Sequence, residues 1–324
     1  MKFSRRRFLH LAAGAIALPA WSPIARAQTY PTRPVHLLVG FPAGNGTDIV
    51  ARLAGQKLSE RLGKSFVIEN RPGAGGSIAT ESVVKAAPDG YTLLAVGNSA
   101  AIDASLYDNL NYNFIRDIAP VAGVAVAGFV LVLTPAFPAR TVAEFIAYAK
   151  ANPGKINIAS TGNGSLSQLC GELLKTMTGV DMVQVGYRTS PAPDLIAGQV
   201  QALFAPISQS IAYIQSGKLR ALAVTSATRQ ASLPDVPTVA ESVPGYEASG
   251  WYGIGAPKST PAAIIDRLNT EMTAALADPD MKTRLNDIGA EPMPMTPAEF
   301  GKFVADETEK WGKVIRTANI KAAE

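Results

Sequence analysis

The chain contains one cysteine, Cys170, and only two histidines, one of which lies within the first ten residues. A single cysteine cannot form an intramolecular disulfide. Metal sites built from several histidine and cysteine ligands are excluded because the chain has too few of these residues. The other histidine, His36, lies in an apolar segment typical of a buried strand. We therefore expect a core or edge histidine there, and neither a metal ligand nor the base of a Ser-His-Asp triad.

Acidic residues are absent from the first 27 positions, which hold five basic residues. This segment opens with Ser4-Arg5-Arg6-Arg7, continues through an apolar stretch too short to span a membrane, and ends in Ala25-Arg26-Ala27. The pattern predicts a signal peptide over residues 1–27, export to the periplasm and a mature chain that starts near Gln28. The arginines resemble a twin-arginine signal but also suit the general export route. No cysteine follows the cleavage site, so we expect neither a lipid anchor nor membrane insertion of the mature chain.

The excess of positive charge is confined to the signal segment. The whole chain has 30 basic and 26 acidic residues, and without residues 1–27 it has 25 and 26. A mature chain with a net charge near zero has no basic field for nucleic acid or for an anionic membrane. The composition also indicates no cofactor-binding motif, and we expect neither a cofactor nor a metal.

The order of predicted elements indicates an α/β fold. Strands alternate with helices, the arrangement that produces parallel sheets with crossover helices. In the first part of the chain we predict strands at 35–40, 65–69 and 91–96, with helices at 48–62 and 77–87. Further on we predict strands at 156–159, 182–185, 201–204 and 220–225, with helices at 141–151, 166–178, 192–197, 208–216, 261–277 and 297–318.

A mature chain of nearly 300 residues is too long for one ordinary core, so two lobes are expected. We predict a first lobe of residues 28–130 plus 251–324 and a second lobe of residues 131–250. Each lobe should be a mostly parallel sheet flanked by helices. Two crossing segments, near 130–133 and 251–256, would form the hinge.

Two glycine-rich loops each connect a predicted strand to a predicted helix. A helix start presents free N–H groups and about half a positive charge, which favours an anion. Thr47 or Asp48 could cap the first helix, and Asp48 could also accept a hydrogen bond from a ligand. A pair of such loops, one in each lobe, could hold a small carboxylate between them. The first loop is Phe41-Pro42-Ala43-Gly44-Asn45-Gly46-Thr47-Asp48, and the second is Ser160-Thr161-Gly162-Asn163-Gly164-Ser165.

Two further loops follow predicted strands. Gly97-Asn98-Ser99-Ala100 offers the Ser99 hydroxyl as a third candidate contact. Arg71-Pro72-Gly73-Ala74-Gly75-Gly76 is more consistent with a structural turn. The Phe41–Asp48 loop does not match a nucleotide motif, because Gly44-x-Gly46 has no third glycine at the required spacing and no Gly-Lys-Ser/Thr follows.

Several of these segments, taken in order, resemble the receptor family of tripartite tricarboxylate transporters, also called Bug or TctC proteins. The resemblance covers essentially the whole mature chain. It implies a two-lobe periplasmic binding protein of type II, a small carboxylate as ligand and a membrane transporter as partner. The matching segments are the Phe41–Asp48 loop, Arg71–Gly76, Ala87-Pro88-Asp89-Gly90-Tyr91-Thr92-Leu93-Leu94, the Thr161–Ser165 loop, Gly171-Glu172-Leu173, Ala197-Gly198-Gln199-Val200, Gly217-Lys218-Leu219-Arg220-Ala221-Leu222-Ala223-Val224 and Leu233-Pro234-Asp235-Val236-Pro237-Thr238-Val239-Ala240-Glu241.

The resemblance also implies roles for individual residues. The first loop would hold one ligand carboxylate, mainly through backbone groups, and the second loop would hold the other end. Tyr187 matches a family tyrosine that precedes a basic residue, here Arg188, which either neutralises the ligand or lies in solvent. Ala205 and Pro206 replace an Asp-Asn pair common in relatives and favour a less polar ligand. The predicted ligand-binding residues are Phe41, Ala43, Gly44, Asn45, Gly46, Thr47, Asp48, Ser99, Thr161, Gly162, Ser165, Tyr187, Arg188, Ala205 and Pro206.

The prediction is therefore a monomeric, non-enzymatic receptor for a dicarboxylate, a tricarboxylate, or an aromatic or amino acid. A sensor that delivers its closed form to a signalling receptor stays open as an alternative. A periplasmic hydrolase is a weaker alternative, because Ser99 and Ser165 lack a histidine within evident reach and no GxSxG motif occurs.

Overall fold

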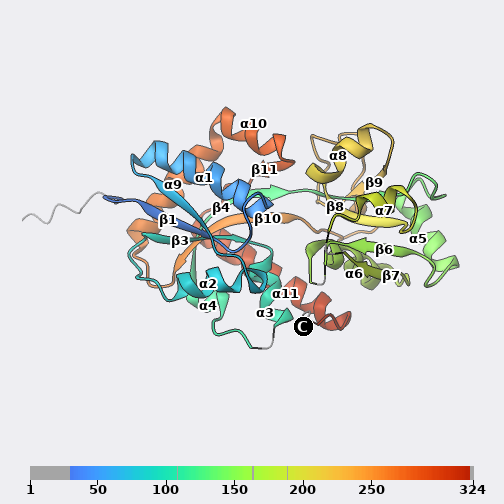
Figure 1. The fold of residues 1–324 in the computed structure, drawn as a ribbon, viewed down its shortest axis with the longest axis horizontal. Coiled ribbons are helices and arrows are strands. Elements are labelled where there is room, and N and C mark those ends of the chain that lie inside the picture. Colours follow the sequence, from blue (N-terminus) through green and yellow to red (C-terminus); the bar gives the residue numbers. More distant parts are fainter. Residues whose placement is uncertain (1–29, 108, 163, 188, 322–324) are drawn as a thin grey trace, which may run out of the picture.

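The computed structural model describes residues 30–321 with the exception of 108, 163 and 188. The predicted signal segment and Arg188 therefore lie outside the described residues. Two sheets dominate the molecule, and each is covered by helices on both faces (Figure 1). The two-lobe α/β prediction is confirmed.

The first sheet has six strands in the order β11-β4-β10-β3-β1-β2. Helices α1, α9 and α10 lie on one side of it, and α2, α3, α4 and α11 lie on the other (Figure 1). The chain enters this lobe through β1 Val35–Val39, α1 Gly46–Leu62, β2 Phe66–Asn70, the 3-10 turn η2 Ala74–Gly76, α2 Ser77–Val84, β3 Thr92–Gly97, α3 Ser99–Leu106, α4 Phe114–Asp117 and β4 Ile118–Ala127. It returns through β10 Gly250–Pro257, α9 Ala262–Ala277, α10 Pro279–Asp287, β11 Ala290–Pro292 and α11 Pro297–Thr317.

The second sheet has five strands in the order β7-β6-β8-β5-β9. Side chains of α5 and α6 fill the core on one face, and side chains of α7 and α8 fill the core on the other. Its elements are β5 Phe129–Leu133, α5 Val142–Ala151, β6 Asn157–Ser160, α6 Leu166–Thr178, β7 Val183–Gly186, α7 Ala192–Ile196, β8 Ala202–Pro206, α8 Ile207–Gln215 and β9 Arg220–Val224, followed by the 3-10 turn η3 Val239–Glu241.

Most strands of each sheet run in one direction, as predicted, but both sheets are mixed. Strand β1 is parallel to β2 and β3, but β10 is antiparallel to β3 and β4. In the second sheet β6 is parallel to β7 and β8, but β5 is antiparallel to β8 and β9. Strands β5 and β10, which carry the chain between the lobes, are antiparallel to their neighbours, and β11 is also antiparallel to β4.

The chain passes from one sheet to the other at two adjacent points. Only Gly128 separates β4 in the first sheet from β5 in the second. Gly250, the first residue of β10, pairs with Ala127, the last residue of β4. The two connections between the lobes therefore lie side by side. The expected lobe boundaries at 130/131 and 250/251 stay a prediction.

A buried polar cluster braces the second connection against the C-terminal helix. The Glu307 carboxylate on α11 accepts from Trp251 Nε1 at 3.2 Å and from Trp311 Nε1 at 2.8 Å. Lys310 forms ion pairs with Glu307 and with Glu247. Burial raises the pKa of Glu307, although Lys310 opposes this shift. Helix α11 contacts α3 and β4 in the first lobe and α6 in the second, so it spans the junction beside the connections.

Candidate functional site

The first glycine-rich loop leads from β1 into α1 and is capped by Asn45. Its backbone is extended (φ −70°, ψ 157°), and its side chain accepts a hydrogen bond from the Thr47 amide at 2.9 Å. Asparagine in this conformation satisfies one of the free N–H groups at a helix start. The helix begins at Gly46, two residues before the predicted start, so the prediction that Thr47 or Asp48 caps it was wrong.

Asp48 lies beneath this loop and is only 1% exposed. Its carboxylate accepts from the Gly44 amide at 2.9 Å, from two Arg52 nitrogens at 2.9 Å each and from Asn70 Nδ2 at 2.8 Å. Burial raises the pKa of Asp48, but the hydrogen bonds from Arg52, Gly44 and Asn70 outweigh burial and leave the pKa below its ordinary value. The carboxylate is thus used to hold the loop in place.

The second loop leads from β6 into α6 and has closely similar geometry. Ser165 caps the helix with an extended backbone (φ −70°, ψ 152°). Its hydroxyl accepts from the Gln168 amide at 3.3 Å and donates to the Gly162 carbonyl at 2.7 Å. The Gln168 side chain accepts from the Gly164 amide at 2.7 Å. This loop is fixed by uncharged groups of its own segment and of α6.

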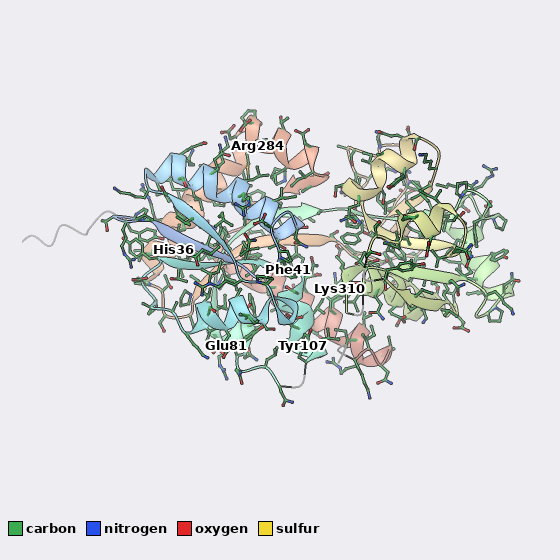
Figure 2. All side chains as sticks on the ribbon, in the orientation of Figure 1. His36, Phe41, Glu81, Tyr107, Arg284 and Lys310 are labelled. Carbon is green, nitrogen blue, oxygen red and sulfur yellow. The ribbon has the colours of Figure 1, made fainter. Side chains whose placement is uncertain are left out.

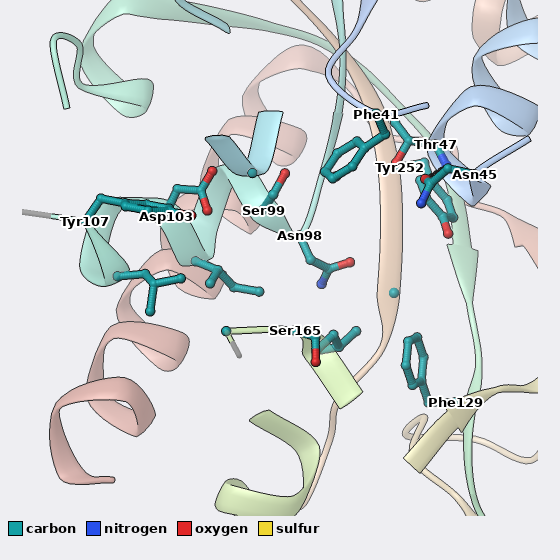
Figure 3. Close-up of a pocket in the computed structure, with 17 residues that line it drawn as sticks. Phe41, Asn45, Thr47, Asn98, Ser99, Asp103, Tyr107, Phe129, Ser165 and Tyr252 are labelled. Carbon is teal, nitrogen blue, oxygen red and sulfur yellow. Dashed lines mark hydrogen bonds between the residues drawn. The ribbon is translucent and has the colours of Figure 1, made fainter. Parts of the chain in front are cut away.

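The two loops meet at one cavity of about 330 Å³ between the lobes. Figure 3 shows Phe41, Asn45 and Thr47 from the first loop on one side and Ser165 from the second loop on another. A larger cavity of about 610 Å³ adjoins it and shares Asn45, Phe129, Leu166 and Tyr252 with it. The two cavities together form the cleft between the lobes.

The structure divides the predicted site residues into three groups. Phe41, Asn45, Thr47, Ser99 and Ser165 line the first cavity. Gly44, Gly46, Thr161 and Pro206 line the second, together with Asn45. The rest line neither cavity or lie outside the described residues, and these are Ala43, Asp48, Gly162, Tyr187, Ala205 and Arg188.

Tyr187 and Ala205 have other surroundings. The Tyr187 hydroxyl donates to Asp194 Oδ2 at 2.8 Å, at the start of α7. Ala205 is buried within β8 and belongs to the core of the second lobe. His36 is distant from the cleft as well. It pairs with Glu69 at 2.5 Å, and Figure 2 shows it toward the outer end of the first lobe, with Phe41 nearer the second.

Sequence reasoning missed the face that α3 presents to the cleft. We expected a loop at 97–100, but Ser99 is the first residue of a helix. Ser99, Ile102, Asp103 and Leu106 line the first cavity, followed by Tyr107 directly after the helix. Their spacing of three and four residues is that of one helix face. This periodicity in Ser99–Leu106 was the available signal. Tyr252 on β10 and Phe129 on β5 carried no comparable signal, because strand pairing between distant segments brings them to the cleft.

The described lining of the first cavity contains no lysine or arginine. Its ionisable side chains are Asp103, Tyr107 and Tyr252. Burial raises the pKa of Asp103 to about 8 and also raises the pKa of Tyr252. Among the described residues of this cavity, the groups that attract an anion are backbone amides and helix starts. Within the described ranges, no group of three or more histidine, cysteine, aspartate or glutamate side chains could hold a metal ion.

Comparison with known proteins gives a consistent result. Residues 50–320 match the family described as the tripartite tricarboxylate transporter family receptor, TctC. The chain is 37% identical to protein BugT of Bordetella pertussis, over 97% of this chain and 96% of that protein. The resemblance inferred from the sequence is confirmed.

Solved structures extend the comparison to the fold. R. palustris Rpa4515 with adipate is 38% identical, has a TM-score of 0.78, and the match covers 90% of this chain and 99% of that one. MatC (Rpa3494) from Rhodopseudomonas palustris with bound malate is 33% identical, has a TM-score of 0.73, and the match covers 88% and 100%. Within residues 30–321, as far as they are described, no helix is long and apolar enough to cross a membrane.

Proposed function

This chain belongs to the TctC family of tripartite tricarboxylate transporter receptors, and from that premise we propose that it binds a small carboxylate in the cleft between its lobes and delivers it to a membrane transporter. The family consists of periplasmic solute-binding receptors. The ligand and the transporter partner are the parts of the proposal that go beyond family membership.

One observation carries the carboxylate proposal: the starts of α1 and α6 both border the same cavity. Each start contributes backbone N–H groups and the positive end of a helix dipole. The two starts belong to different lobes, so a ligand that touches both would favour the closed arrangement. This coupling is what a receptor needs in order to signal occupancy by its shape.

The structural relatives support the chemical class. Rpa4515 is described with adipate and MatC with malate, and both molecules are small dicarboxylates. We infer that this chain also takes a small carboxylate. We propose six of the cavity-lining loop residues as its contacts, Phe41, Asn45, Gly46 and Thr47 in the first loop and Thr161 and Ser165 in the second.

A thermal-shift screen of residues 28–324 against mono-, di- and tricarboxylates and aromatic acids tests the proposal. A ligand at one hundred times its dissociation constant stabilises the folded state by about 2.7 kcal/mol. At least one acid should raise the melting temperature, and Thr47→Val should weaken that effect. Stabilisation by none of these acids would contradict the proposal. Delivery is tested separately by carboxylate uptake in cells with and without the gene.

A further inference from the structure

Asp103 is a carboxylate at the wall of the first cavity that the protein itself does not neutralise. It lies on α3 and is 6% exposed. Figure 3 shows its side chain beside Tyr107 and near Ser99, at the side of the cavity away from Asn45 and Thr47. A Cβ added at Gly75 would lie 3.3 Å from both Asp103 oxygens and 3.4 Å from the Tyr107 hydroxyl. Glycine at this position keeps the approach to the carboxylate open.

The other buried acids all have partners. Asp48 accepts from Arg52, Asn70 and the Gly44 amide, Glu172 pairs with Lys175, and Glu307 accepts from two tryptophans and pairs with Lys310. Among the described residues, the Asp103 carboxylate makes no hydrogen bond or ion pair, and burial alone accounts for its raised pKa. An ionised carboxylate that is buried and unpaired is costly to a folded protein, and burial favours its neutral form, so a cationic partner from outside the chain would be needed to hold it ionised at the cavity wall.

The charge balance of the cavity indicates what that partner carries. The described lining offers no cation to offset the second negative charge of a dicarboxylate, and that charge would hold Asp103 in its protonated form. A ligand with one carboxylate and one cationic amine would match both sides of the cavity. Its carboxylate would lie at the helix starts, and its amine would lie between Asp103 and the Ser99 and Tyr107 hydroxyls.

We propose that the ligand of this receptor is an amino acid in the broad sense, a carboxylate that also bears an ammonium group, and that the ammonium binds Asp103. This inference rests on the proposed function and narrows it. An ammonium has three N–H donors, and Asp103 with its two neighbouring hydroxyls supplies acceptors for them. Charge-assisted hydrogen bonds of this kind are stronger than neutral ones.

Titration calorimetry of residues 28–324 with three acids of equal chain length tests the proposal. The probes are 5-aminopentanoate, pentanoate and glutarate. We expect 5-aminopentanoate to bind at least about tenfold more tightly than the other two, the size of effect given by one charge-assisted contact. Asp103→Asn should remove most of this preference while it changes pentanoate affinity by less than about threefold. The control is Asp306→Asn, an exposed acid on α11 that pairs with Lys302, and it should keep the preference.

A second measurement on the unaltered protein does not depend on how a variant folds. Free Asp103 with a pKa of about 8 is mostly protonated at neutral pH, and pairing with an ammonium requires the ionised form. Binding of 5-aminopentanoate should therefore release close to one proton, measured from titration heats in buffers of different ionisation enthalpy. Tyr107 and Tyr112 are the titratable groups that interact with Asp103, and burial raises the pKa of each above its ordinary value.

The outcomes separate the two proposals. If no acid in the wider screen binds, the carboxylate-binding function fails. If pentanoate or glutarate binds as tightly as 5-aminopentanoate, or if binding takes up a proton, the ammonium proposal fails and carboxylate binding stands. If the preference is lost in Asp287→Asn, which lies at the second cavity, and retained in Asp103→Asn, the ammonium proposal also fails.

Discussion

The two loops that border the first cavity have the same helix caps, but different side-chain interactions hold them in place. Asn45 and Ser165 cap their helices with nearly identical backbone angles, and both helices end at a left-handed glycine, Gly63 and Gly179. Beneath the first loop lies an ionic cluster of Asp48, Arg52 and Asn70. Among the described residues, the second loop is supported by hydroxyl, amide and carbonyl groups, and the Ser167 hydroxyl donates to the Phe204 carbonyl at 2.6 Å.

This difference assigns the loops different mechanical roles. The ionic cluster ties the first loop to β2 through Asn70, which also donates to the Phe41 carbonyl at 3.0 Å. The side-chain bonds of the second loop stay within its own segment and α6, and α6 in turn bonds to β8 through Ser167. We expect the first loop to form a fixed half of the site and the second loop to depend more on contact with the first lobe.

The largest expected effect comes from removing the charge beneath the first loop. Asp48→Asn is nearly isosteric, but it removes the charge and places an N–H donor where the carboxylate accepts two hydrogen bonds. We expect the free energy of unfolding to fall by about 3 kcal/mol at neutral pH, because the carboxylate is buried and fully bonded. Denaturant unfolding of both proteins measures it.

The pH dependence of that difference provides a control. The pKa of Asp48 is lowered in the folded state, so its contribution is present above the unfolded pKa of about 3.9 and is lost as the pH falls through the folded pKa. The two proteins should therefore converge in stability under acid conditions. A stability difference of the same size at acid and neutral pH would contradict the ionic role of Asp48.

The next effect concerns how the second loop meets the first lobe. Gly164 has a φ of +73°, and a Cβ there would lie 2.4 Å from Leu106 Cδ2 on α3. Gly44 in the first loop has a φ of +83° and open space around its Cβ position. Both Gly→Ala variants should lose about 1 kcal/mol of stability to backbone strain.

Only Gly164→Ala should also weaken the binding of a carboxylate found in the screen, by about fivefold beyond Gly44→Ala, because the added methyl meets the opposite lobe. Titration calorimetry of both variants with the same acid measures the difference. Equal affinities would show that the contact between Gly164 and Leu106 plays no part in closing on the ligand.

The sequence predicted those features of the two loops that depend on neighbouring residues, and it missed those that depend on contacts with other segments. The bounds of α6 agree with the prediction because Ser165 and Gly179 are local signals that start and end a helix. The start of α1 was misplaced because Asn45, Thr47 and Asp48 are all good caps, and only backbone angles decide among them. Asp48 was expected at the ligand for a related reason, since the sequence does not show that Arg52 and Asn70 surround it.

Features that depend on contacts between distant segments could not be predicted from local sequence patterns. The antiparallel pairing of β4 with β10 joins segments more than one hundred residues apart, and it brings Tyr252 to the cleft. The surroundings of Asp103 depend on the η2 turn, where Gly75 leaves its carboxylate accessible. The sequence shows Asp103 in the largely apolar segment Ser99–Leu106, but it does not show which group would pair with its carboxylate.

The smallest expected effect tests whether the two caps are interchangeable. Replacing either cap by alanine removes the acceptor for one helix N–H, so Asn45→Ala and Ser165→Ala should each reduce the free energy of unfolding by about 1 kcal/mol. Exchanging the residue types, Asn45→Ser and Ser165→Asn, keeps an acceptor in place and should change stability by less than about 0.5 kcal/mol. Denaturant unfolding of the four variants measures this. Ser165 also donates to the Gly162 carbonyl, a bond that asparagine can replace only through its amide. A loss on exchange confined to Ser165→Asn would therefore show that the second loop depends on the hydroxyl itself, and the similarity of the two loops would then be limited to their backbones.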